Sequence, residues 1–429
     1  MRIIERLHIL SRSEVGAVEQ GPDDDMELQV LKILNSKSTD PSKIYLVEKL
    51  GIVRTCNATA LSTLKQLPER FLYQEIVDKV VVLKPARFHN NVSCWNSAQL
   101  GVYVKFMEEL FAELAALQVS LIDGHPWNCI FHHGRLYHID FGSISAVYAP
   151  DAAAAARNEM IEFSTLANLY PISYLKGLRR KLAEEVHGPQ PFRIDDILRH
   201  AFNNLAANDC HVPLVERYNR IFVKSYTRKG PWIGYRPTVD FESQYDSDPR
   251  MRTLENVIVE NKIESAIDIG ANDGLHSYFM AKECGAEVLS LEYEDFNSSR
   301  FFQFAGSASL PITCACATLE DYVFHLGQVS EEFLPKIELA VLFAVYHHLC
   351  HDFGYSASKL LAELAVLKVR LILLEFVDYT DKFLSLRPRL PGYSVEALQA
   401  ECESQGCQVK VFPAHELGRR LVLIGVASR

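Results

Sequence analysis

The sequence lacks the features of a membrane or secreted protein. Its 429 residues contain no apolar stretch of the roughly 18 residues that a membrane-spanning helix needs. The first residues carry charges and are not followed by an apolar segment with a small-residue cleavage site, so we expect no secretion signal. The ten cysteines form no CxxC pair and no repeated spacing, which disfavours a disulfide framework and favours reduced, buried thiols. We therefore expect a cytoplasmic protein.

Positive charge is also scarce. The 44 lysine and arginine residues are outnumbered by 54 aspartate and glutamate residues, so the net charge is −10, and no long basic run is present. Because such a surface repels a phosphate backbone, nucleic acid is not expected as a substrate or partner. Hydrophobic residues make up 48% and charged residues 23%, which excludes a mainly disordered chain, and the length suggests two or three domains.

The first half of the chain combines short apolar runs, polar turns and one long helical pattern. Apolar residues recur at three- and four-residue spacing between residues 96 and 118, which predicts an amphipathic helix. Two apolar pieces around His-His-Gly-Arg predict a β-hairpin. The predicted strands cover residues 43–47, 80–83, 129–131 and 136–139, and further helices are predicted between 151 and 185. This half is therefore expected to be α+β.

The second half follows a stretch rich in glycine, proline and polar residues, from residue 187 to about 249. We place a domain boundary in this stretch. Beyond it, strand-like and helical runs alternate, which predicts an α/β domain with a doubly wound parallel sheet. The predicted strands are 265–269, 287–291, 312–317, 338–343, 370–376 and 421–426, and the predicted helices are 275–283, 356–367 and 395–405.

The most informative segment of this half is Ala266-Ile-Asp-Ile-Gly-Ala-Asn-Asp-Gly274. An apolar strand ends there, and Gly270 and Gly274 permit a sharp turn and the close approach of a ligand to the backbone. Glu292 ends the next predicted strand, 18 residues beyond Gly274, where a carboxylate can bind both ribose hydroxyls. The GxGxxG motif of dinucleotide sites is absent. A tight turn that binds nothing, or a site for another nucleotide, are the alternatives.

This arrangement resembles the class I S-adenosylmethionine-dependent methyltransferases. Their motif is an acid followed by Gly-x-Gly-x-Gly; here Asp268 is the acid and Asn272 replaces the middle glycine. The resemblance implies S-adenosylmethionine as the cofactor and a Rossmann-like fold. The residues that it implies for cofactor binding are Asp268, Gly270, Asn272, Gly274, Glu292 and, beside the adenine, Asp321.

A second segment of the same half supports this resemblance. Leu339–Leu349 is a predicted buried strand that runs into His347 and His348. In the family, the fourth strand ends beside the transferred methyl group, so the resemblance implies that His347 or His348 accepts the proton of an acceptor hydroxyl. The alternative is that both histidines only shape the pocket, because methyl transfer from a sulfonium often needs little more than alignment. Glu375, near the end of a further apolar strand, is expected at the same rim.

The first half contains a different motif. Asp123 precedes Asn128 by five residues, and Asp140-Phe-Gly follows twelve residues later, after the predicted hairpin. This pattern resembles the catalytic loop of protein kinases and aminoglycoside phosphotransferases. The resemblance implies that Asp123 is the catalytic base and that Asn128 and Asp140 are metal ligands, which hold Mg²⁺ on the phosphates of ATP.

Other kinase signatures are missing from the first 90 residues. They contain no Gly-x-Gly-x-x-Gly loop and no Val-Ala-x-Lys run, and Lys43, Lys49 and Lys84 are only weak candidates for the phosphate-binding lysine. An active phosphotransferase, a nucleotide-binding lobe and a purely structural lobe therefore all stay open.

Taken together, the two motifs resemble bacterial kinase-like/methyltransferase fusions, which include nodulation-related methyltransferases and enzymes that cap polysaccharide chains. We predict a kinase-like domain at 1–230, with a small lobe at 1–90 and a larger lobe at 91–230, and a methyltransferase domain at 231–429. The predicted function is methyl transfer to an oxygen or other nucleophile of a small molecule or glycan, which the kinase-like domain phosphorylates or binds. The alternatives are an ATP-dependent small-molecule or glycan kinase with an accessory methyltransferase-like domain, and a non-catalytic scaffold or ligand sensor.

Overall fold

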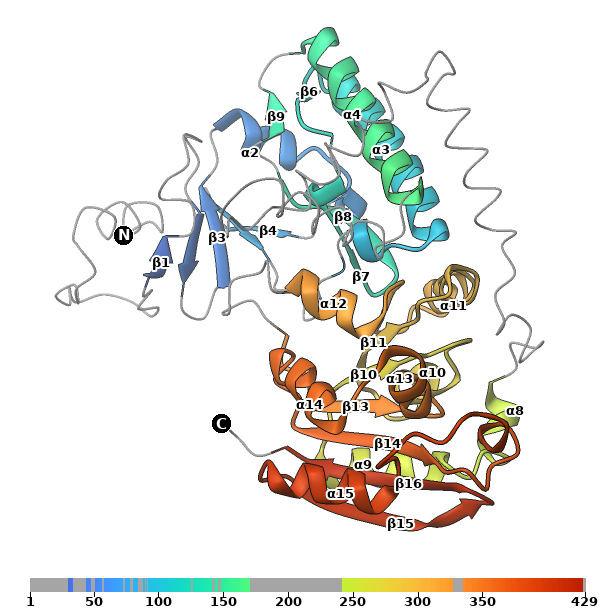
Figure 1. Cartoon of the computed structure of the whole chain (residues 1–429). Coiled ribbons are helices and arrows are strands. Elements are labelled where there is room, and N and C mark those ends of the chain that lie inside the picture. The colour runs from blue at the N-terminus through green and yellow to red at the C-terminus, as the bar shows by residue number, and fades with distance from the viewer. Residues whose placement is uncertain are drawn as a thin grey trace, which may run out of the picture. The chain divides into compact units, whose positions relative to one another are not determined.

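The computed structural model of the chain is shown in Figure 1. It describes residues 30–33, 44–47, 51–55, 58–71, 74–77, 80–83, 88, 90, 92–124, 126–140, 143–145, 148–169, 241–326 and 335–426. The predicted boundary at residue 230 and the three candidate lysines lie outside these residues. The described residues fall into two compact units. Unit 1 is drawn from Met1–Ala86, Val102–Ile130 and Leu136–Ser164, and unit 2 from Arg87–Gly101, Phe131–Arg135 and Thr165–Arg429.

Unit 1 contains a five-stranded antiparallel sheet with the order β1-β2-β3-β5-β4. Its strands are β1 (Val30–Ile33), β2 (Ile44–Val47), β3 (Gly51–Thr55), β4 (Gln74–Val77) and β5 (Val80–Leu83). The strands predicted at 43–47 and 80–83 are thus confirmed. The valine-rich run of β5 suits a strand because β-branched side chains pack well on a pleated surface. Helix α2 (Ala58–Leu64) and the short 3₁₀ helix η1 (Glu69–Phe71) connect β3 to β4.

The remainder of unit 1 is built on helices. The predicted amphipathic helix is α3 (Ser97–Ala116), and its apolar face buries Tyr103, Met107 and Leu110. The other elements here are β6 (Ser120–Leu121), η3 (Pro126–Asn128), β7 (Cys129–His132), β8 (Arg135–His138), β9 (Ile144–Ser145) and α4 (Pro150–Leu169). The tip of the β7–β8 hairpin, Phe131–Arg135, is assigned to unit 2. The hairpin predicted around His-His-Gly-Arg is confirmed as β7 and β8.

Unit 2 contains a seven-stranded sheet with the order β12-β11-β10-β13-β14-β16-β15. The five strands from β12 to β14 are parallel, and β16 lies antiparallel between β14 and β15. The strands are β10 (Ser265–Ile269), β11 (Glu287–Leu291), β12 (Ile312–Ala315), β13 (Leu339–Leu342), β14 (Leu371–Val377), β15 (Gln408–Glu416) and β16 (Arg419–Gly425). The prediction of a parallel-rich α/β unit is confirmed, and the antiparallel hairpin of β15 and β16 is added to it.

The helices of unit 2 connect these strands along the chain. They are α8 (Glu242–Tyr245), α9 (Met251–Asn261), α10 (Leu275–Lys282), α11 (Asp295–Ser307), α12 (Leu319–Leu326), α13 (Tyr346–Phe353), α14 (Ala357–Val366) and α15 (Val395–Ser404), with η6 (Leu384–Leu386) before α15. The helices predicted at 275–283, 356–367 and 395–405 are thus confirmed within a residue at each end. No helix of the described segments is long and apolar enough to cross a membrane.

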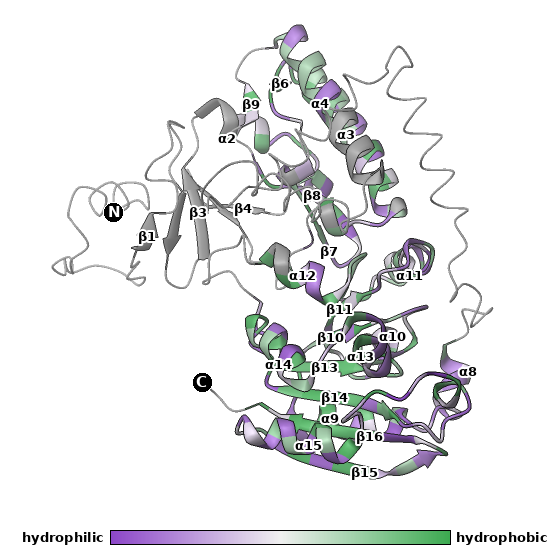
Figure 2. Cartoon of the chain, viewed as in Figure 1, coloured by the Kyte–Doolittle hydropathy of each residue, from purple (hydrophilic) through white to green (hydrophobic). Residues whose placement is uncertain are grey.

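The core of unit 2 lies around its central strands. Every residue of β10 and β13 is buried, and Figure 2 shows β13 and β14 as strongly hydrophobic. Strands that are covered on both faces have near-continuous apolar sequences, whereas β15 alternates and leaves about half of its side chains to solvent. β15 was not predicted, because its run Gln408–Glu416 contains a proline, which disfavours a strand. Its pairing with β16 is also irregular in register.

A segment from early in the sequence completes unit 2. Asn96 and Gln99 form a reciprocal cap before α3: the Gln99 amide donates to Asn96 Oδ1 and the Asn96 amide to Gln99 Oε1, both at 2.9 Å. Asn96 Nδ2 also donates to Ser298 Oγ at 3.0 Å, and Gln99 Nε2 to the Cys314 carbonyl oxygen at 3.0 Å. Unit 2 therefore depends on residues that lie far from it in the sequence, and experiments on it require the full chain.

Candidate functional site

The turn between β10 and α10 is held in a conformation that requires glycine. Gly270 and Gly274 have φ of +71° and +86°, in the left-handed region. A Cβ atom on Gly270 would lie 2.5 Å from Val345 Cγ2, and one on Gly274 would lie 2.3 Å from the ring of Phe301. Asn272, between them, also has a positive φ of +53°. Glycine at both positions therefore lets the turn pack closely against Val345 and Phe301 at the carboxyl end of β10.

Glu292 follows β11 directly and fastens this turn. Its carboxylate accepts hydrogen bonds from the amides of Asn272 and Glu294, both at 2.7 Å, and only 5% of the residue is exposed. Burial raises the pKa of Glu292 to about 7, and the nearby carboxylates of Glu294 and Asp268 add to this effect. Two carboxylate oxygens offer about four acceptor positions, so the two amides leave capacity for further donors.

Asp268 lies one residue before the end of β10 and is 2% exposed. The hydroxyl of Ser277, in the first turn of α10, donates to Asp268 Oδ2 at 2.7 Å. Burial raises the pKa of Asp268, and this hydrogen bond and the charge of Arg250 oppose that rise. Asp268 thus connects the strand before the turn to the helix after it.

Asp321 occupies the first turn of α12, and its amide donates to Thr318 Oγ1 at 3.1 Å. Asp321 is buried. Burial raises the pKa of the Cys94 thiol, in the segment 87–101, and the charge of Asp321 adds to this rise. The predicted strand at 312–317 ends at Ala315, two residues earlier than expected.

His347 and His348 lie on a helix. β13 ends at Leu342, and both histidines are in the first turn of α13. Burial, the neighbouring His348 and the charge of Arg419 together lower the pKa of His347 to about 3, so the ring is neutral at pH 7. Its Nδ1 atom is buried and has no hydrogen-bond partner among the residues that the structure describes.

His348 has a different environment. Its Nδ1 atom lies 3.0 Å from Asp352 Oδ2, one helical turn away, and Asp352 also accepts a hydrogen bond from Arg387 at 2.6 Å. The two imidazole rings are neighbours, with centroids 4.1 Å apart. His347 thus has a buried ring nitrogen with no partner among the described residues, whereas the His348 ring is oriented by Asp352.

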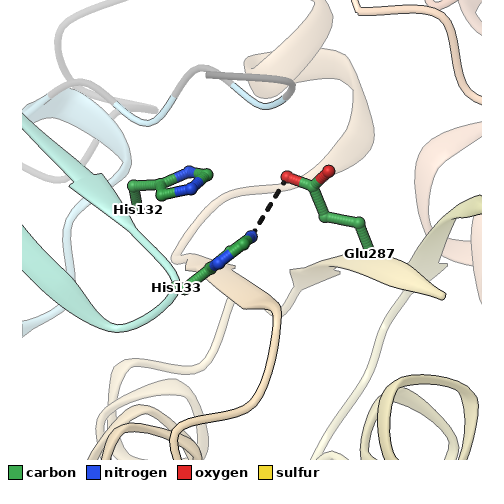
Figure 3. A group of neighbouring side chains, drawn as sticks. All are labelled: His132, His133 and Glu287. Carbon is green, nitrogen blue, oxygen red and sulfur yellow. Dashed lines mark hydrogen bonds and ion pairs between the residues drawn. The ribbon is translucent and has the colours of Figure 1, made fainter. Parts of the chain in front are cut away.

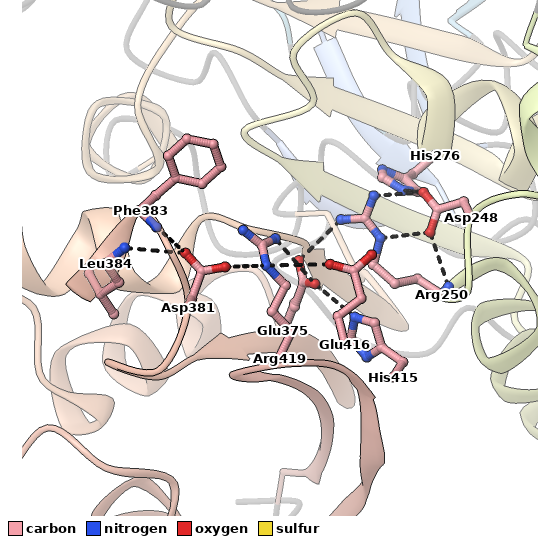
Figure 4. A network of polar contacts seen from close by, with 10 residues as sticks. All are labelled: Asp248, Arg250, His276, Glu375, Asp381, Phe383, Leu384, His415, Glu416 and Arg419. Carbon is pink, nitrogen blue, oxygen red and sulfur yellow. Dashed lines mark hydrogen bonds and ion pairs between the residues drawn. The ribbon is translucent and has the colours of Figure 1, made fainter. Parts of the chain in front are cut away.

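A buried network of charges lies beside these residues and was not expected from the sequence (Figure 4). Its centre is Glu375 of β14, 1% exposed, which lies 3.0 Å from His415 Nε2, 3.1 Å from Arg250 Nη1 and 3.6 Å from Arg419 Nη1. Burial alone would raise the pKa of Glu375, but the hydrogen bond from His415 and the charges of Arg250 and Arg419 lower it to about 2. Glu375 is therefore a structural anchor for three cationic or polar side chains.

The network extends to both sides of Glu375. Arg250 is bound by both oxygens of Asp248, and Asp248 Oδ2 lies 3.4 Å from His276 Nε2. Arg419 Nε donates to Asp381 Oδ2 at 2.8 Å. The only sequence signal for this network is an isolated glutamate in the apolar run of β14, because its partners come from distant segments.

The topology brings the residues predicted in the second half to one edge of the sheet. Asp268 lies on β10 and Glu292 follows β11, while His347 follows β13 and Glu375 lies on β14. These four strands are parallel neighbours in the order β11-β10-β13-β14. In open α/β sheets, ligands bind outside the carboxyl ends of such strands.

The residues of the kinase-like motif lie in unit 1. Asp123 follows β6, Asn128 ends η3 directly before the hairpin, and Asp140 comes two residues after the hairpin. Asn128 is buried; its carbonyl accepts from the Ile139 amide at 2.8 Å, and its side-chain Nδ2 has no partner among the described residues. The Ser143 hydroxyl donates to the Asp140 carbonyl at 2.5 Å.

Comparisons with known proteins find remote structural likeness. No family model and no curated protein matches the chain. Crystal structures of the bifunctional kinase-methyltransferase WbdD match 46% of this chain and 40% of that chain, with 17% identity and a TM-score of 0.30. The N-terminal domain of EvdMO1, with SAH and D-fucose, matches 41% of this chain and 82% of that chain at 16% identity and a TM-score of 0.30. The methyltransferase domain of bacterial CtHen1 matches 44% of this chain and all of that domain, at 13% identity and a TM-score of 0.30.

The chain thus spans less than half of the WbdD chains that it matches. WbdD, CtHen1 and METTL16 are each described as methyltransferases, and the sheet of unit 2 is rich in parallel strands. At these TM-scores, the functional argument rests on the geometry of the site itself.

Proposed function

We propose that unit 2 is an S-adenosylmethionine-dependent methyltransferase that acts on an oxygen of a small molecule or glycan. The observation that carries this proposal is the pair formed by the glycine turn after β10 and the buried Glu292 at the end of β11. The two glycines let the turn pack against Val345 and Phe301, where a Cβ atom would clash, and the Glu292 carboxylate lies at the tip of the adjacent strand. A nucleoside with free ribose hydroxyls matches both features.

In this proposal, Glu292 accepts hydrogen bonds from the ribose hydroxyls of the cofactor. Gly270 and Gly274 admit the cofactor against the backbone, Asn272 shapes the turn, and Asp268 holds the turn in register with α10. Asp321 is assigned to the adenine side of the site. Bound S-adenosylmethionine supplies a methyl group on a positively charged sulfur, which is an electrophile for an oxygen nucleophile.

The chain then has to orient the acceptor and remove its proton. The pair His347 and His348, in the first turn of α13, is assigned to this role, because their rings are neighbours and Asp352 holds the His348 ring in place. As the carbon–oxygen bond forms, the hydroxyl proton passes to the imidazole and from there to solvent. Of the two, His348 is the better base, because the carboxylate of Asp352 stabilises a protonated ring, whereas the pKa of His347 is lowered to about 3.

Calorimetry with S-adenosylmethionine on the full chain tests cofactor binding. We expect one site, with affinity reduced by at least about tenfold in Glu292→Ala, because a lost hydrogen bond to a charged group costs roughly 1.5–3 kcal/mol. Glu403→Ala, an exposed glutamate on α15, is the matched control and should bind like the wild type. The proposal is wrong if no heat is seen at millimolar cofactor, or if Glu292→Ala binds with unchanged affinity.

Transfer of radiolabelled methyl groups to fractionated cell extract tests the reaction. We expect a labelled small molecule or glycan, and a loss of label transfer in His348→Ala with cofactor affinity retained. Labelled product would also eliminate the alternative that the protein is only a scaffold or ligand sensor. Identification of the product would define the acceptor.

The second candidate function places chemistry in unit 1, as an ATP-dependent kinase of a small molecule or glycan. It is supported by the order Asp123, Asn128, hairpin, Asp140, and by the buried Asn128 side chain beside the hairpin. Asn128 and Asp140 would hold Mg²⁺, and Asp123 would accept the hydroxyl proton. This assignment predicts Mg²⁺-dependent ATP binding that Asp140→Ala abolishes. Unchanged binding in that variant would reject the metal ligands proposed here.

A further inference from the structure

The tip of the β7–β8 hairpin carries two adjacent histidines next to a glutamate of the sheet (Figure 3). His132 ends β7, His133 lies in the turn, and Glu287 is the first residue of β11; all three belong to unit 2. His133 Nε2 lies 3.4 Å from Glu287 Oε1, and one ligand atom from each of the three residues lies within 4.8 Å of the others. The sequence analysis used His-His-Gly-Arg only as a turn signal.

The backbone brings the two imidazoles to the same side. In a regular strand, successive side chains point in opposite directions. Here His133 and Gly134 have φ of +46° and +73°, which is the two-residue turn with positive φ at both positions. The His132 and His133 rings consequently stack, with centroids 3.7 Å apart and an angle of 25° between their planes. A non-glycine residue pays for this conformation, which asparagine or glycine would adopt more easily.

The environment of His132 favours a neutral ring. The ring is half-buried and packs against the His133 ring, and both conditions oppose a positive charge on it. A neutral imidazole offers a lone pair on one ring nitrogen, which is the form that binds metals. Two stacked rings could not both carry a proton without strong repulsion.

We propose that His132, His133 and Glu287 bind a divalent transition metal of the zinc class. Zinc bound tetrahedrally at about 2.0–2.1 Å sets its ligand atoms about 3.4 Å apart. The pair His133–Glu287 already has this separation, the His132 nitrogen lies within 4.8 Å of both, and binding would require the His132 ring to turn out of the stack. Two nitrogen ligands favour zinc, cobalt, nickel or copper over magnesium or calcium, and solvent completes the coordination.

This metal site is separate from the proposed methyl-transfer site. Glu287 starts β11, whereas Glu292 follows its end, so the two carboxylates mark opposite edges of the parallel sheet. The hairpin tip also lies against α11, where a Cβ atom on Gly134 would be 3.0 Å from the Gly306 Cα atom. A metal would therefore fasten the hairpin tip to the sheet of unit 2.

Cobalt titration of the full chain, freed of metal with a chelator, tests the proposal. We expect one Co²⁺ to give visible absorption bands of a low-symmetry site without the near-ultraviolet band of thiolate ligation, and Zn²⁺ to displace it. His132→Ala and Glu287→Gln should each weaken binding by at least about tenfold, because loss of even an outer-shell partner costs 10- to 100-fold. His351→Ala, which removes a histidine from α13, should bind like the wild type.

The proposal is overturned if no Co²⁺ binds at millimolar metal, or if His132→Ala, Glu287→Gln and the wild type bind Co²⁺ with the same affinity. Circular dichroism confirms that each variant is folded. Because Glu287→Gln keeps the size of the side chain, it remains informative if His132→Ala does not fold. A Co²⁺ spectrum with a strong thiolate band would assign the metal to cysteines and would also refute the site.

Discussion

The tight turn after β10 offers the sharpest test of the proposed cofactor site. In Gly274→Ala, the new methyl group meets the ring of Phe301 at 2.3 Å, in addition to occupying a φ of +86°. Gly285→Ala is a matched control in the same unit, because Gly285 has a φ of +70° but no atom within 4 Å of the added Cβ. Both variants share the cost of a left-handed alanine, and only Gly274→Ala adds a steric clash.

The magnitudes follow from these two terms. A left-handed non-glycine residue costs about 1–2 kcal/mol, which is the whole effect expected for Gly285→Ala. Overpacking in a filled site costs about 1–3 kcal/mol more, so Gly274→Ala should lose about 2–5 kcal/mol. Phe301 is 2% exposed, so its ring has little room to move away. The clash should also displace the turn and weaken S-adenosylmethionine binding by more than about tenfold, whereas Gly285→Ala binds normally.

Urea denaturation of the full chain, with hydrogen exchange of peptides from β10 to β11, measures the loss in unit 2. A double-mutant cycle isolates the clash, since Phe301→Ala removes the ring that Gly274→Ala meets. The loss of unfolding free energy in the double variant should then be smaller than the sum of the losses in the two single variants, with a coupling of about 1–3 kcal/mol. Equal destabilisation by Gly274→Ala and Gly285→Ala, or strict additivity with Phe301→Ala, would refute the packing that we describe around this turn.

Three further predictions follow from buried polar groups. Because Glu292 has a pKa of about 7 and must be ionised to accept ribose hydroxyls, S-adenosylmethionine affinity should fall about tenfold from pH 8 to pH 6; a pH-independent affinity in calorimetry would contradict this role. Glu375→Gln should cost about 1.5–3 kcal/mol at pH 7, since it removes charged hydrogen-bond partners of Arg250 and His415 while Arg250 keeps Asp248, and the exposed Glu403→Gln should cost less than about 0.5 kcal/mol. The pKa of Glu375 is lowered to about 2, so the ionised side chain stabilises the fold above about pH 4.5, and this stabilisation is lost as the pH falls through 2. The free energies of unfolding of the wild type and Glu375→Gln should therefore converge on acidification, and parallel pH curves would contradict this. Asn96→Ala should destabilise unit 2 by about 1–3 kcal/mol, because it removes a helix cap and the bond to Ser298, and an unchanged denaturation midpoint would exclude that contribution.

Local patterns predicted the elements of unit 2 well. The alternation of apolar strands and helices located β10, β11, α10, α14 and α15 within a residue or two. Their signals are local, because a buried strand needs a short continuous apolar run and a helix needs a repeat of three and four residues. β15 was missed because it is half exposed and irregular. His347 and His348 were expected at a strand end, and the structure places them in the first turn of α13.

Local patterns could not predict which segments of the chain belong to unit 2. The segment 87–101 is distant in sequence, yet Asn96 and Gln99 donate to Ser298 and Cys314. Such contacts join side chains about 200 residues apart and leave no periodic pattern. The same reason explains why the sequence analysis did not connect Glu375 with its cationic partners.

The sequence by itself determined the five parallel strands of unit 2, its helices α10, α14 and α15, and the glycine turn, because backbone conformation and burial act over a few neighbouring residues. It also placed Asp268 and Glu292 at strand ends. Only the tertiary structure decided which groups meet: Glu292 with the Asn272 amide, Glu375 with Arg250, and the two histidines of the hairpin with Glu287. Those contacts depend on the order of strands in the sheet and on a turn with positive φ. Their free energy depends on burial, which a local sequence pattern does not show.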